Sequence, residues 1–377
     1  MIPVQVLREK TAGRQVAGFL RDIIKIKSLS GMEKKVARRV KQQMRAAGFD
    51  EVITSPMGSV IGRIGNGRKK ILYDAHIDTV DTGDLKGWKY KPLEALYRNN
   101  TVYGRGACDD KGSVTAMVFA GKAVKQLDSS PDFTLWISAS VKEEEAEGRG
   151  IAEVLRITGR PDYVVIGEPS SLKIIRGHKG RAGLKLTVSG KAVHASIPEK
   201  GVNAVYKMTN VIKKIEEYNG ALPVNSRLGK GVVSVTGIES ASASHNTIPD
   251  KCCIWIDRRT NEKDTENSVM EGLRKLAGKT ARVELLRKFF PAWIIEKEHP
   301  LVETARKAFR RVFNKNPQVT LWPFCTNGSH TMGERNIPTI GFGPGDESLC
   351  HGTDEHISVR EVMDAIKFYT IFPFMLV

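Results

Sequence analysis

The strongest constraint on the fold is a regular alternation of β-rich runs and helical segments in the first half of the chain. Three runs typical of strands, EVITSPMGSVIGRI, KKILYDAHID and DFTLWISASVKEEE, each lead into turn or polar residues. A helix rich in small residues is predicted at 111–126, and a fourth run, DYVVIGEPS, follows a helical segment at 151–157. Strands that alternate with helices indicate an α/β layer with mostly parallel strands, whose sites lie at the carboxyl ends of the strands.

Two amphipathic helices are predicted before the first of these runs. Their apolar residues recur at helix spacing over 15–30 and 32–47, and Ser30 is the expected N-cap of the second helix. With the alternating segments that follow, they extend the predicted α/β layer toward the start of the chain.

The pattern changes after Gly177. From there the chain alternates apolar and polar residues as a half-exposed strand does, and the predicted order becomes β-α-β-β-α-β, which is typical of a small α+β, ferredoxin-like domain. The first pattern returns near Phe289, with a helix at 300–313 and a last helix at 359–371. We therefore predict a catalytic α/β domain with a mostly parallel sheet flanked by helices, formed by 1–178 and 289–377. An inserted α+β domain at 179–288 interrupts it.

Composition limits the class of protein. A chain of 377 residues suggests two domains at about 150 residues each. The hydrophobic fraction is 41% and the charged fraction 27%, and no apolar run is long enough to span a bilayer. The first residues contain no apolar core of signal-peptide length, so we expect a cytoplasmic protein without a membrane partner. Five cysteines without a C-x-x-C pair argue against a disulfide framework and a zinc ribbon.

The net charge of +17 raises nucleic acid or an acidic partner as alternatives. However, the basic residues are dispersed, and in the helix at 32–47 they alternate with Val36, Val40 and Met44 at helix spacing. Most of this charge therefore belongs to solvated helix faces, and nucleic acid is not the expected partner.

Polar side chains follow the predicted strands of the outer domain where each strand ends. Histidine or acidic residues follow ILYDA, LWISASVK and YVVIG, acidic residues lie in GRGACDDKG, and a histidine lies in the loop after IGFGPGDESL. The carboxyl ends of parallel strands emerge on one edge of a sheet, so we expect these groups to converge. The candidate residues are His76, Asp78, Asp109, Glu143–Glu145, Glu168 and His351.

A cluster of imidazoles and carboxylates without an obligatory cysteine suits Zn²⁺, Co²⁺ or Mn²⁺. Crowded carboxylates repel one another and raise each other's pKa values, and a pair of divalent cations removes that conflict. Two metals about 3.5–4 Å apart can share a water, lower its pKa and polarise a carbonyl. We therefore predict two divalent metal ions, with Zn²⁺ preferred and Co²⁺ or Mn²⁺ as alternatives.

Eight motifs in series connect these residues to a known family. HIDTV, YGRGACDDKG, KEEE, VIGEPS, GKAVHASIPEKGVNA, NTIPD, DRR and GFGPG with CHGTDEH occur in this order and cover nearly the whole chain. The series resembles the co-catalytic metallopeptidase family of acetylornithine deacetylase, succinyl-diaminopimelate desuccinylase and glutamate carboxypeptidase. The stretch CTNGSHTMGERNIPTIGFGPGDE is most similar to a subgroup of hydrolases linked to selenium metabolism.

The resemblance implies a role for each metal-ligand candidate. Asp109 would bridge the two metals, His76 and Glu168 would complete one site, and Glu144 and His351 would complete the other. Each of these residues stands at the matching position of a family motif.

The same resemblance implies two residues that act beside the metals. Asp78 would hydrogen-bond His76 and orient it, and Glu143 would take a proton from the bridging water and pass it to the leaving amine. Two of the motifs can be aligned with the family in two ways. Counting from the strand favours Glu143 and Glu144 as the acidic pair over Glu144 and Glu145. The family places the bridging carboxylate two residues before a lysine, which selects Asp109 over its neighbour.

The inserted domain is expected to supply a second group. In the family, the histidine that matches His194 reaches a neighbouring subunit's active site and steadies the oxyanion, which implies a homodimer through an inserted lid and dimerisation domain. Asn246 and Arg259 match positions that contact substrate, and Arg259 suits a carboxylate through its fork of donors. Gly328 and Ser329 lie where the family places a substrate loop.

Other polar residues have simpler readings. Arg259 could instead be a structural salt-bridge partner of Asp257. Asp74, Asp81 and Asp84, which stand close to His76 in the sequence, are expected in turns and on the surface.

The leading prediction is a dinuclear metallohydrolase that cleaves the amide bond of an N-acyl amino acid or short peptide with a free carboxylate. The acyl group and the amino acid are left open. The alternative from a different class is a catalytically inactive or basic binding protein on the same fold, with an acidic partner or nucleic acid as its ligand.

Overall fold

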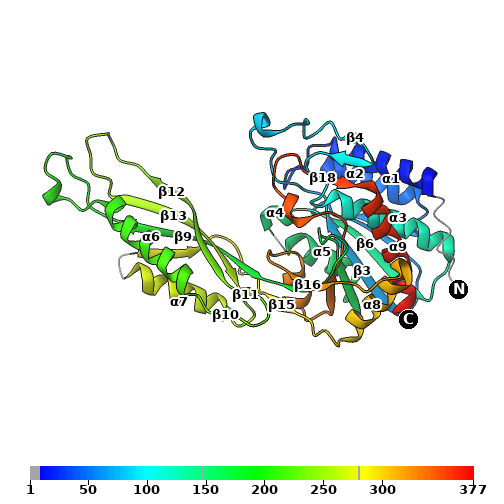
Figure 1. Cartoon of the computed structure of the whole chain (residues 1–377). Helices are drawn as coiled ribbons and strands as arrows, with labels where there is room; N and C mark the ends of the chain where they lie inside the picture. The colour runs from blue at the N-terminus through cyan, green and yellow to red at the C-terminus, as the bar shows by residue number, and fades with distance from the viewer. Residues whose placement is uncertain (1–8, 147, 279–280) are drawn as a thin grey trace. The chain divides into compact units, whose positions relative to one another are not determined.

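The computed structural model describes residues 9–146, 148–278 and 281–377, which fall into two compact units (Figure 1). The first unit contains the chain up to Gly177, Ile294–Trp322 and Thr326–Val377, and the second contains His178–Trp293 with Pro323–Cys325. In this division His178 and residues 289–293, which the sequence pattern assigns to the catalytic domain, lie in the second unit. There the backbones of Arg181 and Phe290 form two reciprocal N–H···O hydrogen bonds of 2.9 Å.

A nine-stranded mixed sheet forms the core of the first unit, in the order β1-β2-β6-β3-β7-β17-β8-β15, with β16 paired to β8. The four central strands, β6, β3, β7 and β17, run parallel. β1 pairs antiparallel with β2, β2 with β6, and β8 with β17. The predicted α/β fold with a mostly parallel central sheet is confirmed. The strands are β1 (Glu51–Thr54), β2 (Val60–Ile64), β3 (Lys69–His76), β6 (Phe133–Ser140), β7 (Tyr163–Ile166), β8 (Ile174–His178), β15 (Trp293–Ile294), β16 (Val319–Trp322) and β17 (Thr339–Gly341).

Helices flank this sheet. The helix α3 is buried along most of its length and packs against α1, α9 and β3, which explains its many small residues. The predicted helix at 300–313 forms as α8, with a proline in its first turn and a left-handed Asn314 after its end. The helices are α1 (Glu9–Ile24), α2 (Lys34–Ala46), α3 (Lys111–Leu127), α4 (Glu143–Ala146), α5 (Arg149–Thr158), α8 (Pro300–Phe313) and α9 (Val359–Ile371).

The first helix differs from its predicted range because the segment after it is extended. α1 ends at Ile24, and Leu29 forms a parallel bridge with Thr79. The predicted N-cap role of Ser30 is wrong, since α2 begins after Glu33 without a side-chain cap. The Ser30 hydroxyl instead donates to Asp78 Oδ2 at 2.5 Å, so a tertiary contact replaces the local one.

The register of the parallel strands brings their carboxyl ends to one level. His76, the last residue of β3, pairs with Ser140, the last residue of β6. Ile166 at the end of β7 pairs with Gly341 at the end of β17. The segments that carry the candidate residues therefore leave the sheet side by side.

A small three-stranded sheet stands beside this edge and connects two of the loops. It contains β4 (Leu96–Arg98), β5 (Thr101–Tyr103) and β18 (His356–Ser358), in the order β18-β5-β4. Because β5 and β18 pair antiparallel, the loop that follows Tyr103 and the loop that precedes His356 start from adjacent positions.

The second unit has the predicted ferredoxin-like order. Its antiparallel sheet runs β12-β13-β9-β14, and α6 and α7 pack on it around a core that includes Leu184, Met208 and Ile254. The strand β9 alternates buried and half-buried residues, as its sequence predicts. The elements are β9 (Gly180–Ser189), α6 (Ala204–Ala221), β10 (Val224–Asn225), β11 (Gly229–Lys230), β12 (Val232–Ser240), β13 (Lys251–Thr260), α7 (Glu266–Ala277) and β14 (Ala281–Leu285).

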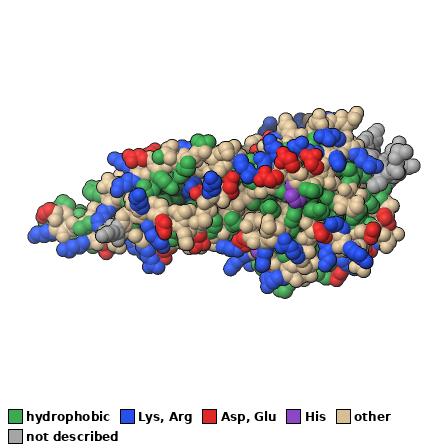
Figure 2. Space-filling model, turned by 90° about the horizontal axis from the view of Figure 1, so that it is seen from below, with side chains coloured by type: hydrophobic (Ala, Val, Ile, Leu, Met, Phe, Trp, Pro, Cys, Tyr) green, Lys and Arg blue, Asp and Glu red, His purple; other side chains and the backbone are tan. Residues whose placement is uncertain are grey.

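The basic side chains are dispersed over the surface, as the sequence predicts. Figure 2 shows Lys and Arg side chains scattered over the visible face and interrupted by acidic, apolar and other groups. Within the described ranges, the helices are too short or too polar to cross a membrane.

Candidate metal centre

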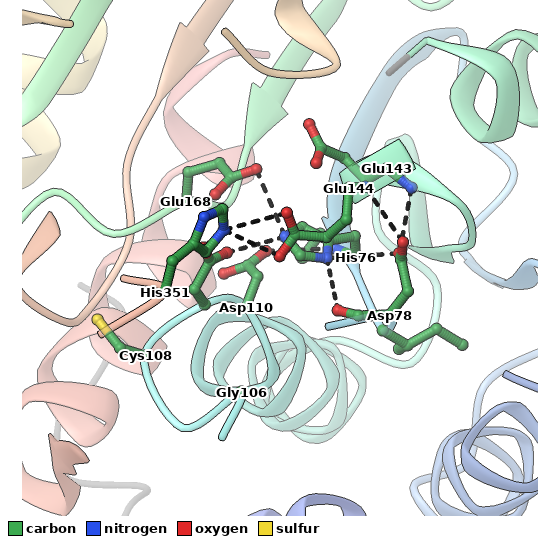
Figure 3. A network of polar contacts seen from close by, with 12 residues as sticks. His76, Asp78, Gly106, Cys108, Asp110, Glu143, Glu144, Glu168 and His351 are labelled. Atoms are coloured by element: carbon green, nitrogen blue, oxygen red, sulfur yellow. Dashed lines mark hydrogen bonds and ion pairs between the residues drawn. The ribbon is translucent and has the colours of Figure 1, made fainter. Parts of the chain in front are cut away.

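Two groups of candidate ligand atoms lie at the carboxyl edge of the sheet. The first cluster contains His76, Asp109 and Glu168, and the second cluster contains Asp109, Glu144 and His351. Within each cluster the ligand atoms all lie within 4.8 Å of one another. The structure thus brings together the five residues for which the resemblance implied a metal-binding role, from five separate segments. Figure 3 labels four of them, His76, Glu144, Glu168 and His351.

Asp109 belongs to both clusters. Its Oδ1 lies 2.9 Å from His76 Nε2, and its Oδ2 lies 3.2 Å from His351 Nε2. Burial raises the pKa of Asp109, but the hydrogen bonds with the two histidines outweigh burial and hold this pKa below its usual range. A carboxylate that presents one oxygen to each cluster has the geometry of a bridging ligand. The neighbouring Asp110 belongs to neither cluster and accepts the backbone N–H of His76 at 3.2 Å.

The tautomer of His76 shows why the first cluster suits a cation. His76 Nδ1 lies 2.9 Å from the carbonyl oxygen of Asp78, which can only accept, so Nδ1 carries a proton. Nε2 then faces Asp109 Oδ1 at 2.9 Å and Glu168 Oε1 at 3.8 Å. A lone pair and two carboxylates that converge in a buried site need either a second proton on the imidazole or a metal ion.

Burial and mutual charge shift the pKa values of these groups. Burial raises the pKa of Glu168 well above its ordinary value, and burial followed by the Asp109 charge raises the pKa of Glu144. Burial would lower the pKa of His76, but hydrogen bonds with Asp109 and Asp78 raise it well above its ordinary value. The clusters therefore hold protons when metal is absent, and metal binding would displace them.

The second cluster opens to solvent through His351, whose side chain is 54% exposed. Its Nε2 lies 3.1 Å from Glu144 Oε2, and hydrogen bonds with Asp109 and Glu144 raise the pKa of His351 to about 10. Solvent therefore reaches this side of the centre.

Asp78 contacts residues of both clusters. Its Oδ1 lies 3.5 Å from His76 Nδ1 and accepts the backbone N–H of Glu143 at 3.1 Å, while its Oδ2 accepts the N–H of Glu144, also at 3.1 Å. These contacts link Asp78 to the imidazole of the first cluster and to the segment Glu143–Glu145 that supplies the second (Figure 3).

The acidic turn, Glu143–Glu145, presents one candidate ligand and one further buried carboxylate. Glu144 Oε atoms lie among the ligand atoms of the second cluster, whereas Glu145 is exposed. Glu143 is outside both clusters yet buried, with 6% of its surface exposed. This arrangement matches the frame in which Glu143 and Glu144 form the acidic pair.

The remaining predicted residues belong to neither ligand cluster. His194 and Asn246 belong to the second unit, exposed and 3.2 Å apart between His194 Nε2 and Asn246 Nδ2. Arg259, also in the second unit, forms an ion pair of 2.6 Å with Asp257, the structural alternative considered above. Gly328 and Ser329 belong to the first unit and are buried.

One expectation from the sequence is wrong. Asp74 is not on the surface but fully buried in β3, where the hydroxyls of Ser138 and Ser140 and the Asn327 side chain hydrogen-bond to its carboxylate. Burial raises the pKa of Asp74, and these bonds oppose that rise. Its position inside an otherwise apolar strand was the signal for this role.

A mostly parallel central sheet with two imidazole–carboxylate clusters that share one carboxylate is typical of one class of protein, the co-catalytic metallohydrolases. The particular family follows from the sequence. The model for the family described as Peptidase family M20/M25/M40 matches residues 72–373, and the chain belongs to this family. It is a metallohydrolase that acts on amide bonds.

Two curated relatives match most of the chain. The protein named "Uncharacterized protein YgeY" of Escherichia coli K12 is 34% identical over 392 residues, which cover 99% of this chain and 97% of the relative. A protein of Staphylococcus epidermidis named "Probable succinyl-diaminopimelate desuccinylase" is 26% identical over 387 residues, which cover 93% and 95%.

Solved structures share the fold over nearly the whole length. The M20 family metallo-carboxypeptidase Sso-CP2 from Sulfolobus solfataricus has a TM-score of 0.80 at 19% identity, over 95% of this chain and 98% of that one. The YXEP protein of Bacillus subtilis, described as a dinuclear metal binding peptidase from the M20 family, has a TM-score of 0.71 at 16% identity, over 98% and 99%.

Proposed function

We propose that the protein hydrolyses the amide bond of an N-acyl amino acid or short peptide that carries a free carboxylate, with two divalent metal ions. The observation that carries the proposal is the Asp109 carboxylate, whose two oxygens face two histidines at 2.9 and 3.2 Å. The names of the relatives, a probable desuccinylase and a metallo-carboxypeptidase, support a substrate with an amide bond near a carboxylate.

The residues present suit two such ions, of which Zn²⁺ is preferred and Co²⁺ and Mn²⁺ are alternatives. His76 and Glu168 would hold one ion, Glu144 and His351 would hold the other, and Asp109 would contact both. When bound, the ions would supply a water of lowered pKa and polarise the substrate carbonyl.

Glu143 is the proposed proton carrier. Its backbone N–H is fixed by Asp78 and its side chain is buried beside Glu144, outside the two clusters. In this role its carboxylate takes a proton from the attacking water and later gives it to the leaving amine nitrogen.

Substrate contacts are proposed for the second unit and for one loop of the first. Arg259 would hold the substrate carboxylate through its guanidinium, in competition with its ion pair to Asp257. Asn246 would contact the substrate, and the loop with Gly328 and Ser329 would contribute further substrate contacts.

The proposed function is tested by a substrate screen on metal-reconstituted protein. The protein is stripped by chelation, reloaded with Zn²⁺, Co²⁺ or Mn²⁺, and assayed with N-acyl amino acids and dipeptides. Matched substrates whose carboxylate is replaced by an amide serve as controls, and should be cleaved at least about tenfold less efficiently because a charge-assisted contact is lost. Hydrolysis without any metal, or equal cleavage of the amidated controls, would contradict the proposal.

His194 is the proposed oxyanion donor, acting on the active site of a second subunit in a homodimer. We expect His194→Ala to lower kcat by about 10²–10³ with a smaller change in KM, because an oxyanion contact forms mainly in the transition state. His245→Ala, in the same exposed loop region, is the control and should retain activity. Sedimentation equilibrium decides the linked question, since a strictly monomeric and fully active enzyme rules out a role across subunits.

A further inference from the structure

The Glu355 side chain is fully buried and surrounded by four hydrogen-bond donors. Its Oε1 accepts the backbone N–H groups of Cys108 at 2.8 Å and Asp109 at 3.0 Å. Its Oε2 accepts the backbone N–H of Gly106 at 3.0 Å and Arg105 Nη1 at 2.8 Å. One carboxylate therefore fixes the backbone of the loop that ends in the shared ligand, Asp109.

Arg105 extends this connection to a second ligand. Its guanidinium is buried, and while Nη1 binds Glu355, Nη2 donates to the backbone carbonyl oxygen of His351 at 3.3 Å. The ring of Trp88 lies 5.0 Å from the Arg105 guanidinium carbon and limits its movement. In Figure 3 the loop through Gly106 and Cys108 passes beside His351.

The backbone of His351 needs such support. Its φ of 62° lies in the left-handed region, which a residue other than glycine adopts only when its surroundings hold it there. The two loops also start from the small sheet, where Gly104 donates its N–H to the Glu355 carbonyl oxygen at 2.8 Å. Main-chain pairing thus places Glu355 between them.

We propose that Glu355, through Arg105, is a positioning residue that fixes Asp109 relative to His351 and thereby sets the metal affinity of the second cluster. The inference rests on the proposed metal-binding function. Two of the three ligands of the second cluster, Asp109 and His351, stand on loops that the Glu355–Arg105 pair holds. In the first cluster, only Asp109 stands on such a loop. The geometry of the second cluster therefore depends more on the Glu355–Arg105 pair.

The test is a Co²⁺ titration of the metal-free full-length chain, followed by the visible absorption of each bound equivalent. Glu355→Gln places an amide NH₂ opposite backbone N–H groups or the guanidinium, so the loop must shift. We expect the Co²⁺ equivalent at the second cluster to bind about 10–100-fold more weakly and with an altered spectrum, because losing an outer-shell partner typically costs that much affinity. The equivalent at the first cluster should change much less. Arg105→Lys keeps the charge opposite Glu355 but loses the fork that reaches His351, so we expect a smaller loss at the second cluster.

Glu153→Gln is the matched control, because Glu153 is also a buried glutamate that fixes a loop. Its carboxylate accepts the Ser55 hydroxyl and the backbone N–H of Met57, in segments that supply no ligand to either cluster. It should leave both Co²⁺ equivalents unchanged.

The outcomes separate the inference from the proposed function. Two wild-type equivalents with an unaffected second equivalent in Glu355→Gln and Arg105→Lys overturn the positioning role and leave the metal centre standing. An equal loss of both equivalents also overturns it, because the predicted selectivity is absent. If Glu355→Gln does not fold, Arg105→Lys decides alone. Fewer than two equivalents in the wild type contradict the dinuclear centre itself, and the inference fails with it.

Discussion

Replacing Glu143 by Gln is expected to lower kcat by about 10²–10⁴, the usual contribution of a general acid–base. Glutamine keeps the shape of the side chain and the backbone N–H bond to Asp78, but its amide cannot accept the proton of the attacking water. Because Glu143 lies outside both ligand clusters, the variant should still bind two metals. The measurements are steady-state kinetics and metal analysis of the same preparation.

The control for this experiment is a substitution two positions later in the chain. Glu145→Gln removes an equivalent carboxylate from the same acidic turn, but Glu145 is exposed and belongs to neither cluster. It should retain full turnover. Full turnover in Glu143→Gln would refute the assigned role. A loss of metal in that variant would instead make Glu143 a ligand.

The sequence predicted the parts of the site that depend on the ends of strands. His76 and Glu168 stand at or just after the ends of runs predicted as strands, and parallel pairing places such ends together. The helices α8 and α9 were also predicted at their observed bounds, because local apolar spacing, with Pro300 at the start of α8, defines them. These features depend on local sequence.

Other parts depend on contacts between distant segments and could not be predicted. The partners of Glu355 are backbone N–H groups about 250 positions earlier in the chain, and a backbone donor leaves no signal in the residue type. Ser30 looked like a helix cap, but its hydroxyl donates a hydrogen bond to the buried carboxylate of Asp78, 48 positions later in the chain. The position of Asp74 inside an apolar strand signals its burial, but not its partners Ser138 and Asn327, which come from separate segments.

Replacing Asp109 by Ala is expected to remove both metal equivalents, because the same carboxylate presents Oδ1 to the first cluster and Oδ2 to the second. The fall in affinity should exceed the about 10–100-fold that an outer-shell partner costs, since a direct ligand is lost. Activity should fall to that of the chelated wild type. Circular dichroism of the metal-free proteins checks that the variant still folds.

Two single-cluster variants make the Asp109 prediction specific. Glu168→Ala removes a ligand from the first cluster alone, and His351→Ala removes one from the second alone, so each should retain one equivalent of metal. Asp81→Ala, which deletes an exposed aspartate whose Oδ2 forms an ion pair with Lys27, should retain both. If Asp109→Ala retained one tightly bound equivalent, Asp109 would serve a single ion and the two clusters would be independent sites. Loss of both equivalents in Asp109→Ala, with one retained in each single-cluster variant, is the pattern that a bridging carboxylate alone produces.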